Sequence, residues 1–159
     1  MTIINSKTLA RIAAIQVAYQ ITLNNRLDGF DTIAHQVQDY YIGDEVHDDL
    51  ELPNNSLKMK LHKNFYGELC SQFKLNLDNI DNVIKTHLSS DWPFENLHVN
   101  LKALLRCGVM ELMYFPEVPS KVVINEYTNI SSDMLKSQEV GFINSILDTI
   151  NKEIRKDAS

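Results

Sequence analysis

The sequence predicts an all-α fold, a bundle of about seven helices in a single domain over residues 1–159. Apolar residues recur three or four positions apart through most of the chain, whereas no sustained period-two stretch indicates a strand. Only 5 Gly and 4 Pro occur among the 159 residues, which disfavours a turn-dense all-β fold. No internal repeat and no linker divides the chain.

The first half of the chain contains four segments with helical apolar spacing, at residues 7–24, 30–41, about 57–73 and 77–88. Ser6 and Ser56 are the expected N-caps of the first and third segments, because a serine side chain accepts hydrogen bonds from the first N–H groups of a helix. Residues 42–54 are acidic and contain Gly43 and Pro53, which predicts a loop.

The second half contains three more expected helices, at about 95–114, 119–132 and 138–155. They are separated from the first half at Trp92-Pro93, because the residue before a proline is pushed out of the helical region. The first and last of the three are the most apolar, so Leu105 and Ile146 are expected in the core. Gly108 lowers helix propensity, which is tolerable if a neighbouring helix approaches closely there.

Charge is distributed unevenly along the chain, whose formal net charge is −6. Residues 1–27 hold three basic residues and no acidic one, whereas residues 28–51 hold eight acidic residues and no lysine or arginine. Two readings stay open, a solvated surface or a basic patch built by the first helix. No apolar run reaches the length of a membrane span and no signal peptide is recognisable, so a cytoplasmic protein is expected.

Residues that could support catalysis do not form a recognisable pattern. Cys70 and Cys107 lie far apart in helices of apolar character, which favours buried structural thiols over a disulfide or a zinc site. The five glycines are not clustered as in a phosphate-binding loop, and no Glu-x-x-His or other metal-ligand spacing occurs. No cofactor, no metal and no enzymatic activity are therefore expected.

The first helix carries the most suggestive polar residues. Lys7 and Arg11 stand four apart, so they share a helix face and could contact successive phosphates of a nucleic acid. Tyr19 lies two turns further along and could stack on a base. The alternative is a solvent-exposed amphipathic helix with a half-buried tyrosine.

Two later segments place polar residues beside apolar stripes. Asn125 and Glu126 follow a buried stripe, and capping or hydrogen bonding between helices accounts for such groups. Phe142, Asn144 and Asp148 cannot all share the core-facing side of the last helix with Ile143. An exposed Phe beside an Asn would make a base-contacting pair, and edge packing of the ring against a neighbouring helix is the alternative.

Four segments combine into a recognisable order. Residues 104–112 (LLRCGVMEL), 118–126 (VPSKVVINE) and 141–148 (GFINSILD) match the patterns ILR-x-A-x-YEL, VP-x-KVAINE and KFVNGVLD at their usual intervals. Residues 10–19 (ARIAAIQVAY) look like the helix AR-x-x-A-x-QALY. With these motifs the chain resembles the NusB family of bacterial transcription antitermination factors, over most of its length and most weakly across 28–90.

The resemblance implies two packed helical sub-bundles and a protein that joins the transcription elongation complex. It implies binding to the boxA element of nascent ribosomal RNA leaders together with NusE, a small-subunit ribosomal protein. The residues that it places at or near RNA are Lys7, Arg11, Tyr19, Lys121, Phe142 and Asn144. It places the NusE-binding surface nearby, at Glu111 and the connection from Met134 to Gln138.

The chain also departs from the family pattern. Thr8 and Leu9 stand where further arginines are usual, and Gly141, Met110 and Met134-Leu135 replace a lysine, a tyrosine and a Phe-Gly pair. Fewer cations predict weak binding to RNA alone and a stronger dependence on the protein partner. One alternative stays open, a protein-interaction bundle with weak or lost RNA binding. A similar helical domain precedes the catalytic domain of some ribosomal RNA cytosine methyltransferases, but such an enzyme would need a further Rossmann-type domain, for which 159 residues leave no room.

Overall fold

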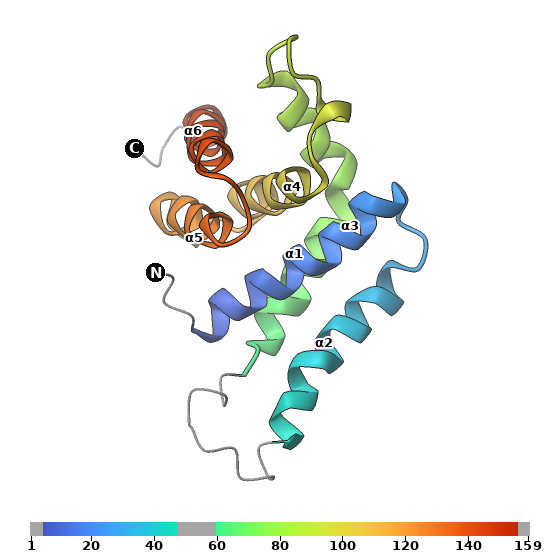
Figure 1. Cartoon of the computed structure of the whole chain (residues 1–159). Helices are drawn as coiled ribbons and strands as arrows, with labels where there is room; N and C mark the ends of the chain where they lie inside the picture. The colour runs from blue at the N-terminus through green and yellow to red at the C-terminus, as the bar shows by residue number, and fades with distance from the viewer. Residues whose placement is uncertain (1–4, 48–59, 156–159) are drawn as a thin grey trace.

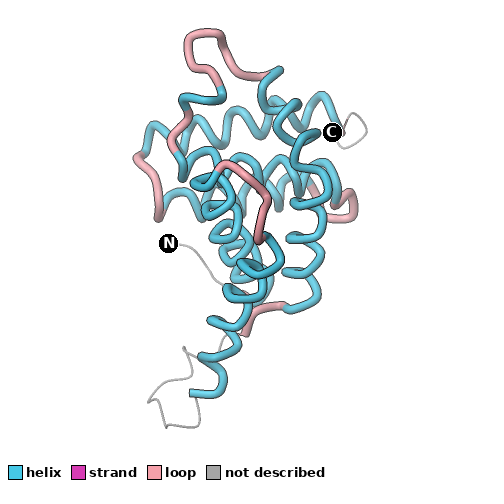
Figure 2. The backbone as a smooth tube through the Cα atoms, turned by 90° about the vertical axis from the view of Figure 1, so that its right-hand side faces the viewer, coloured by secondary structure: helices cyan, strands magenta, loops and turns pink. Residues whose placement is uncertain are grey.

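The computed structural model describes residues 5–47 and 60–155, which form six α-helices and one short 3-10 helix and contain no strand (Figures 1 and 2). The elements are α1 (Ser6–Asn24), α2 (Phe30–His47), α3 (Lys63–Thr86), η3 (Phe94–Asn96), α4 (Val99–Tyr114), α5 (Ser120–Ser132) and α6 (Ser137–Ile154). The predicted all-α class is confirmed, and the helix count is close to the expected seven.

Helix α1 begins on a different cap from the one expected. Asn5, not Ser6, is the N-cap, and its side-chain oxygen accepts a hydrogen bond from the Thr8 backbone N–H at 2.8 Å. The helix ends at Asn25, whose left-handed backbone (φ 58°) is tolerated by asparagine.

Helix α2 continues through residues 42–47, so the prediction of a loop there is wrong for these residues. The single Gly43 costs only about 1 kcal/mol of helix propensity, which is too little to end a helix with favourable neighbours. The rest of the expected loop, residues 48–54, lies outside the described residues, as does Ser56.

Helix α3 joins what the sequence suggested were two helices. It starts at Lys63 with His62 as N-cap, and residues 60–62 before it are not helical, so the expected start near 57 is wrong. At Asn76 the backbone leaves helical geometry (φ −120°, ψ 17°), and the Asn76 amide donates to the Gln72 carbonyl at 3.0 Å. The break in apolar spacing between 73 and 77 is therefore a kink, not a helix end.

Helix α4 forms the centre of the molecule and packs against α1 and α3 on one side and against α5 and α6 on the other (Figure 1). It begins at Val99 instead of 95, because Leu97 and His98 are extended after the η3 turn. A Cβ atom on Gly108 would lie 3.0 Å from Leu147 of α6, so a neighbouring helix does approach closely at this glycine.

The core residues predicted from apolar spacing are buried. Leu105 is 0% and Ile146 is 6% exposed, and both belong to one continuous apolar cluster. Cys70 and Cys107 are buried free thiols, as expected, and burial raises the pKa of Cys70 to about 11. Among the described helices, none has the length and apolarity that crossing a bilayer requires.

Candidate nucleic-acid interface

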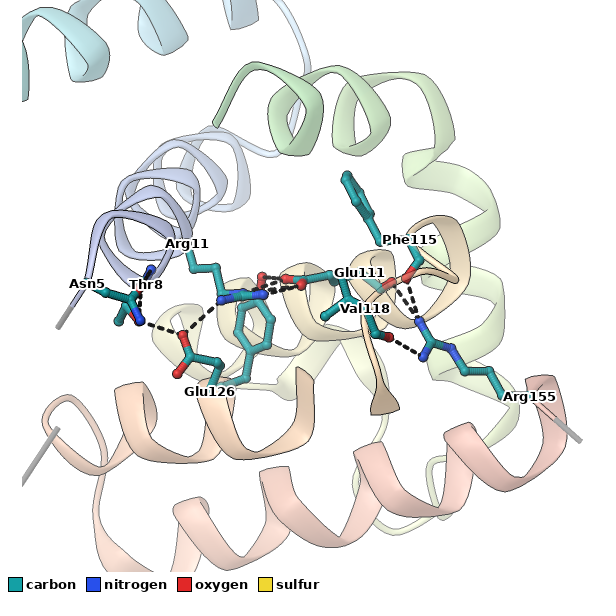
Figure 3. Close-up of polar contacts among 9 residues, drawn as sticks. Asn5, Thr8, Arg11, Glu111, Phe115, Val118, Glu126 and Arg155 are labelled. Atoms are coloured by element: carbon teal, nitrogen blue, oxygen red, sulfur yellow. Dashed lines mark hydrogen bonds and ion pairs between the residues drawn. The ribbon is translucent and has the colours of Figure 1, made fainter. Parts of the chain in front are cut away.

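Arg11 lies inside the protein, so the expectation that it stands exposed beside Lys7 is wrong. Its side chain is 4% exposed, and its guanidinium faces two carboxylates (Figure 3). Its Nε donates to Glu111 Oε1 at 2.9 Å and its Nη2 to Glu111 Oε2 at 2.6 Å, while Nη1 donates to Glu126 Oε1 at 2.9 Å. With its donors directed at these two carboxylates, Arg11 is not available to a phosphate at the surface.

The two carboxylates extend this contact into a buried network that joins α1 to α4 and α5. Glu111 also accepts a hydrogen bond from the Tyr127 hydroxyl at 2.8 Å, and Glu126 accepts one from the Thr8 hydroxyl at 2.7 Å. Burial lowers the pKa of Arg11, but the hydrogen bond and the charge of Glu111 outweigh it and raise that pKa. Burial and the charge of Glu111 raise the pKa of Tyr127 well above its ordinary value. Arg11 therefore stays charged and Tyr127 neutral.

Glu111, expected at the partner-binding surface, is fully buried. Its carboxylate is occupied by Arg11 and Tyr127, so a partner cannot reach it without opening the core. Glu126 makes hydrogen bonds between helices, to Thr8 and Arg11 of α1, which is the structural role that the sequence analysis allowed for it. Glu111 is therefore not a surface contact; through Arg11 it fixes helix α1 on helix α4.

A second arginine, which the sequence analysis did not single out, secures the end of α4. Arg155 follows α6, and its guanidinium donates to the backbone carbonyls of Leu112, Val118 and Phe115 at 2.9, 2.7 and 2.9 Å. Figure 3 shows Arg11 and Arg155 approaching the last turn of α4 from opposite sides. The only sequence signal was a cation at the end of the last helix, which does not identify acceptors some forty residues earlier.

The other two predicted site residues of α1, Lys7 and Tyr19, face solvent as expected. Lys7 is exposed, with its ammonium 5.4 Å from the centre of the Phe65 ring, and Tyr19 is 36% exposed. Lys7 borders a cleft of about 600 Å³ between α1, the start of α3 and the connection from α4 to α5. The acidic residues of this cleft are Glu68, Glu117 and Glu126, so its charge does not favour an anion.

Phe142 and Asn144 point to different neighbours, so the expected exposed pair does not form. The Phe142 ring is half-buried and packs against Trp92, in the connection between α3 and α4, with ring centres 4.8 Å apart. Asn144 is exposed and its Oδ1 accepts a hydrogen bond from the Thr128 hydroxyl of α5 at 3.3 Å. The ring therefore packs on the connection between α3 and α4, which is neither the exposed pair nor the edge packing against a neighbouring helix that were expected.

The other predicted contact residues are on the surface. Lys121 is exposed in the first turn of α5. Met134 is 41% exposed in the connection between α5 and α6, and Gln138 is exposed in the first turn of α6. Of the nine predicted site residues, the structure buries only Arg11 and Glu111, and it joins these two to each other.

The fold and this surface define the class: an all-helical protein that presents cationic and aromatic side chains on its outer helix faces. The described side chains, those of residues 5–41 and 60–155, include no group of three or more placed to hold a metal ion.

Comparison with known proteins identifies the family. The family model described as NusB family matches residues 8–152. The transcription antitermination protein NusB of Rickettsia bellii is 41% identical over 96% of this chain and 94% of its own length, and that of Rickettsia akari is 42% identical over 96% of each. The solved structure of T. maritima NusB shares the fold with a TM-score of 0.72 at 22% identity, covering 95% of this chain and 94% of its own. The chain belongs to the NusB family.

Proposed function

We propose that this protein is a transcription antitermination factor that binds the boxA element of nascent ribosomal RNA leaders together with NusE, in the cytoplasm and without catalysis. The observation that carries the proposal is the family match across residues 8–152, with relatives named transcription antitermination proteins at 41–42% identity.

Several exposed side chains, together with the half-buried ring of Phe142, support a surface for single-stranded RNA. Lys7 and Lys121 supply charges for phosphates, and Tyr19 and Phe142 supply rings on which bases can stack. Asn144 adds an amide for a base edge. Arg11 enters the proposal as a buried residue that holds α1 in place, and not as a phosphate contact.

In this proposal NusE binds beside the RNA surface, around the start of α6. Met134 and Gln138 are exposed there, and Met134 offers the kind of apolar side chain that is enriched at protein interfaces. Burial of Arg11 leaves fewer surface cations than the sequence suggested, on a chain of net charge −6. RNA binding by this protein alone is therefore weak, and NusE contributes the additional contacts.

The test is a titration of boxA RNA, with a scrambled RNA as control, into the protein with and without NusE at about 0.05 and 0.2 M salt. Lys7 and Lys121 alone give a log–log salt slope of about −1.4, so affinity should fall at least about sevenfold between the two salt concentrations. Preference for boxA over the scrambled RNA, strengthened by NusE, is the expected result.

The same titration separates the proposal from a second candidate, a protein-interaction bundle with weak or lost RNA binding. The burial of Arg11 and the net negative charge favour that candidate. Binding to NusE without any preference for boxA at either salt concentration would replace the proposed function by this one.

A further inference from the structure

Three cations gather around one aromatic ring that takes no part in the contacts described so far. Phe94 of η3 is 6% exposed. The ammonium of Lys102 lies 4.2 Å from the centre of its ring, the ammonium of Lys85 5.2 Å away and the Arg106 guanidinium 5.4 Å away. A cation over an aromatic face is attracted to it, which explains how the ring holds the three positive groups, but the attraction does not neutralise their charge.

Of the three cations, Arg106 alone forms an ion pair with an acidic residue among those that the structure describes. Arg106 forms a two-pronged contact with Asp81 at 2.9 and 2.8 Å and donates to the Thr22 hydroxyl at 2.9 Å. In the part of the chain that the structure describes, Lys85 and Lys102 have no carboxylate within ion-pair distance. The first turn of α4, which contains Lys102, holds no acidic residue.

Lys102 is partly buried, and two cations and two carboxylates act on its charge. Burial lowers the pKa of Lys102, and the charges of Arg106 and Lys85 lower it further, against the opposing effect of Asp81 and Glu95. A bound anion would favour the charged form of Lys102, because it would add negative charge beside two ammonium groups that share one ring.

We infer that Lys85 and Lys102 bind a backbone phosphate of the RNA strand, on the platform that the Phe94 ring provides. The inference rests on the proposed function and extends its surface to the connection between α3 and α4. Each ammonium carries three N–H donors, and a phosphodiester has two non-bridging oxygens that share one negative charge, so both lysines can bind one phosphate.

The position of the cluster favours RNA as the source of that phosphate. Trp92 packs on Phe142, a proposed RNA-contacting residue, and stands two residues before Phe94, so that their Cα atoms are at most about 7 Å apart. On the other side, Arg106 bonds to Thr22, which is about one helical turn beyond Tyr19 on α1. Cations interleaved with exposed aromatic rings are typical of surfaces that bind single strands.

The cleft beside Lys7 is a weaker candidate for such a contact. Its lining combines two cations, Lys7 and Arg11, with three carboxylates, those of Glu68, Glu117 and Glu126. Arg11 is already paired with Glu111 and Glu126, so of these two cations only Lys7 is available to an anion. The cluster on Phe94 has the opposite balance, three cations around one ring and a direct carboxylate partner for only Arg106. An anionic backbone therefore gains more at the second position.

The experiment compares the double variant K85A/K102A with K74A/K152A in boxA RNA titrations over a series of salt concentrations, with and without NusE. Lys74 and Lys152 are exposed and pair with Asp31 and Asp148, so the control removes the same net charge at other places. The K85A/K102A variant should lose about 1.4 from the log–log salt slope and roughly tenfold in affinity near 0.15 M salt, while the control stays close to the unaltered protein. The variant K85R/K102R should restore the slope.

A second readout reports on the site directly. In NMR spectra, the side-chain ammonium signals of Lys85 and Lys102 should shift when a short boxA RNA is added, and the pKa of Lys102 should rise in the complex. A purely structural role of these lysines would leave both quantities unchanged on RNA addition.

The outcomes distinguish the inference from the proposed function. If the unaltered protein does not bind RNA at all, both are overturned. If it binds and K85A/K102A keeps the slope of the control, the inference alone is overturned. A loss of affinity for NusE without RNA in this variant would also overturn it, because the lysines would then contact the protein partner.

Discussion

Replacement of Arg11 by methionine tests the buried network that replaces the expected phosphate contact. The change leaves the Glu111 carboxylate, which is 0% exposed, with the Tyr127 hydroxyl as its remaining hydrogen-bond donor among the contacts described. Removing one partner of a buried ion pair costs about 3–5 kcal/mol, because an uncompensated charge stays in the core. The variant R11M should therefore lose about this much free energy of unfolding, a large part of what holds an ordinary domain together.

The measurement is urea unfolding followed by circular dichroism, with K7M as the matched control on the same helix. Lys7 is exposed, so K7M should stay within about 0.5 kcal/mol of the unaltered protein. Should R11M not fold, the double variant R11M/E111L provides the measurement, since it removes both charges and should be at least about 1 kcal/mol more stable than R11M. A loss below about 1 kcal/mol in R11M, or a double variant less stable than R11M, would refute the reasoning.

Three further predictions concern the frame of the molecule. L105A and I146A should each lose about 2–5 kcal/mol in urea unfolding, because both side chains are buried, and a loss below 0.5 kcal/mol in both would show the packing to be wrong. R155A should lose about 2–3 kcal/mol of free energy of unfolding, because it leaves the carbonyls of the last turn of α4 and of Val118 without their charged donor. Equal thermal unfolding temperatures of R155A and the unaltered protein would contradict this. Burial raises the pKa of Cys70 from 9.0 to about 11, so the stability that its neutral thiol contributes is complete below pH 9 and is lost as the pH rises through about 11. Thiol titration of the folded protein should show no Cys70 thiolate below pH 9. Rapid modification of Cys70 by a thiol reagent at pH 8 would contradict this.

The helices were predictable where the periodic apolar pattern is long and unambiguous. The segments that became α1, α5 and α6 agree with the structure to within one residue at most ends. The errors occur where local signals compete: Asn5 and Ser6 can each cap α1, and the broken pattern near Asn76 indicates either a helix end or a kink. Which cap is used, and whether a helix ends or kinks, depends on tertiary packing, which the local sequence does not reveal.

The candidate site was predictable as a set of residues but not as an arrangement. A spacing of four places Lys7 and Arg11 on related sides of one helix, yet burial separates them because Glu111 and Glu126 arrive from α4 and α5. The acidic partners of Arg11 are 100 and 115 residues away in sequence, so no local sequence pattern predicts these contacts. The cation cluster on Phe94 was missed for the same reason, since it assembles from three separate elements.

The coupling between RNA and NusE tests the central claim most directly. Calorimetric titrations would measure the affinity of the protein for NusE alone and when saturated with boxA RNA, and the affinity for RNA with and without NusE. The proposed function predicts that each ligand raises affinity for the other by the same factor, about 5- to 150-fold, and that substitution of Gln138 by Ala lowers this factor while RNA affinity alone is kept. Equal RNA affinity in the presence and absence of bound NusE would contradict the account.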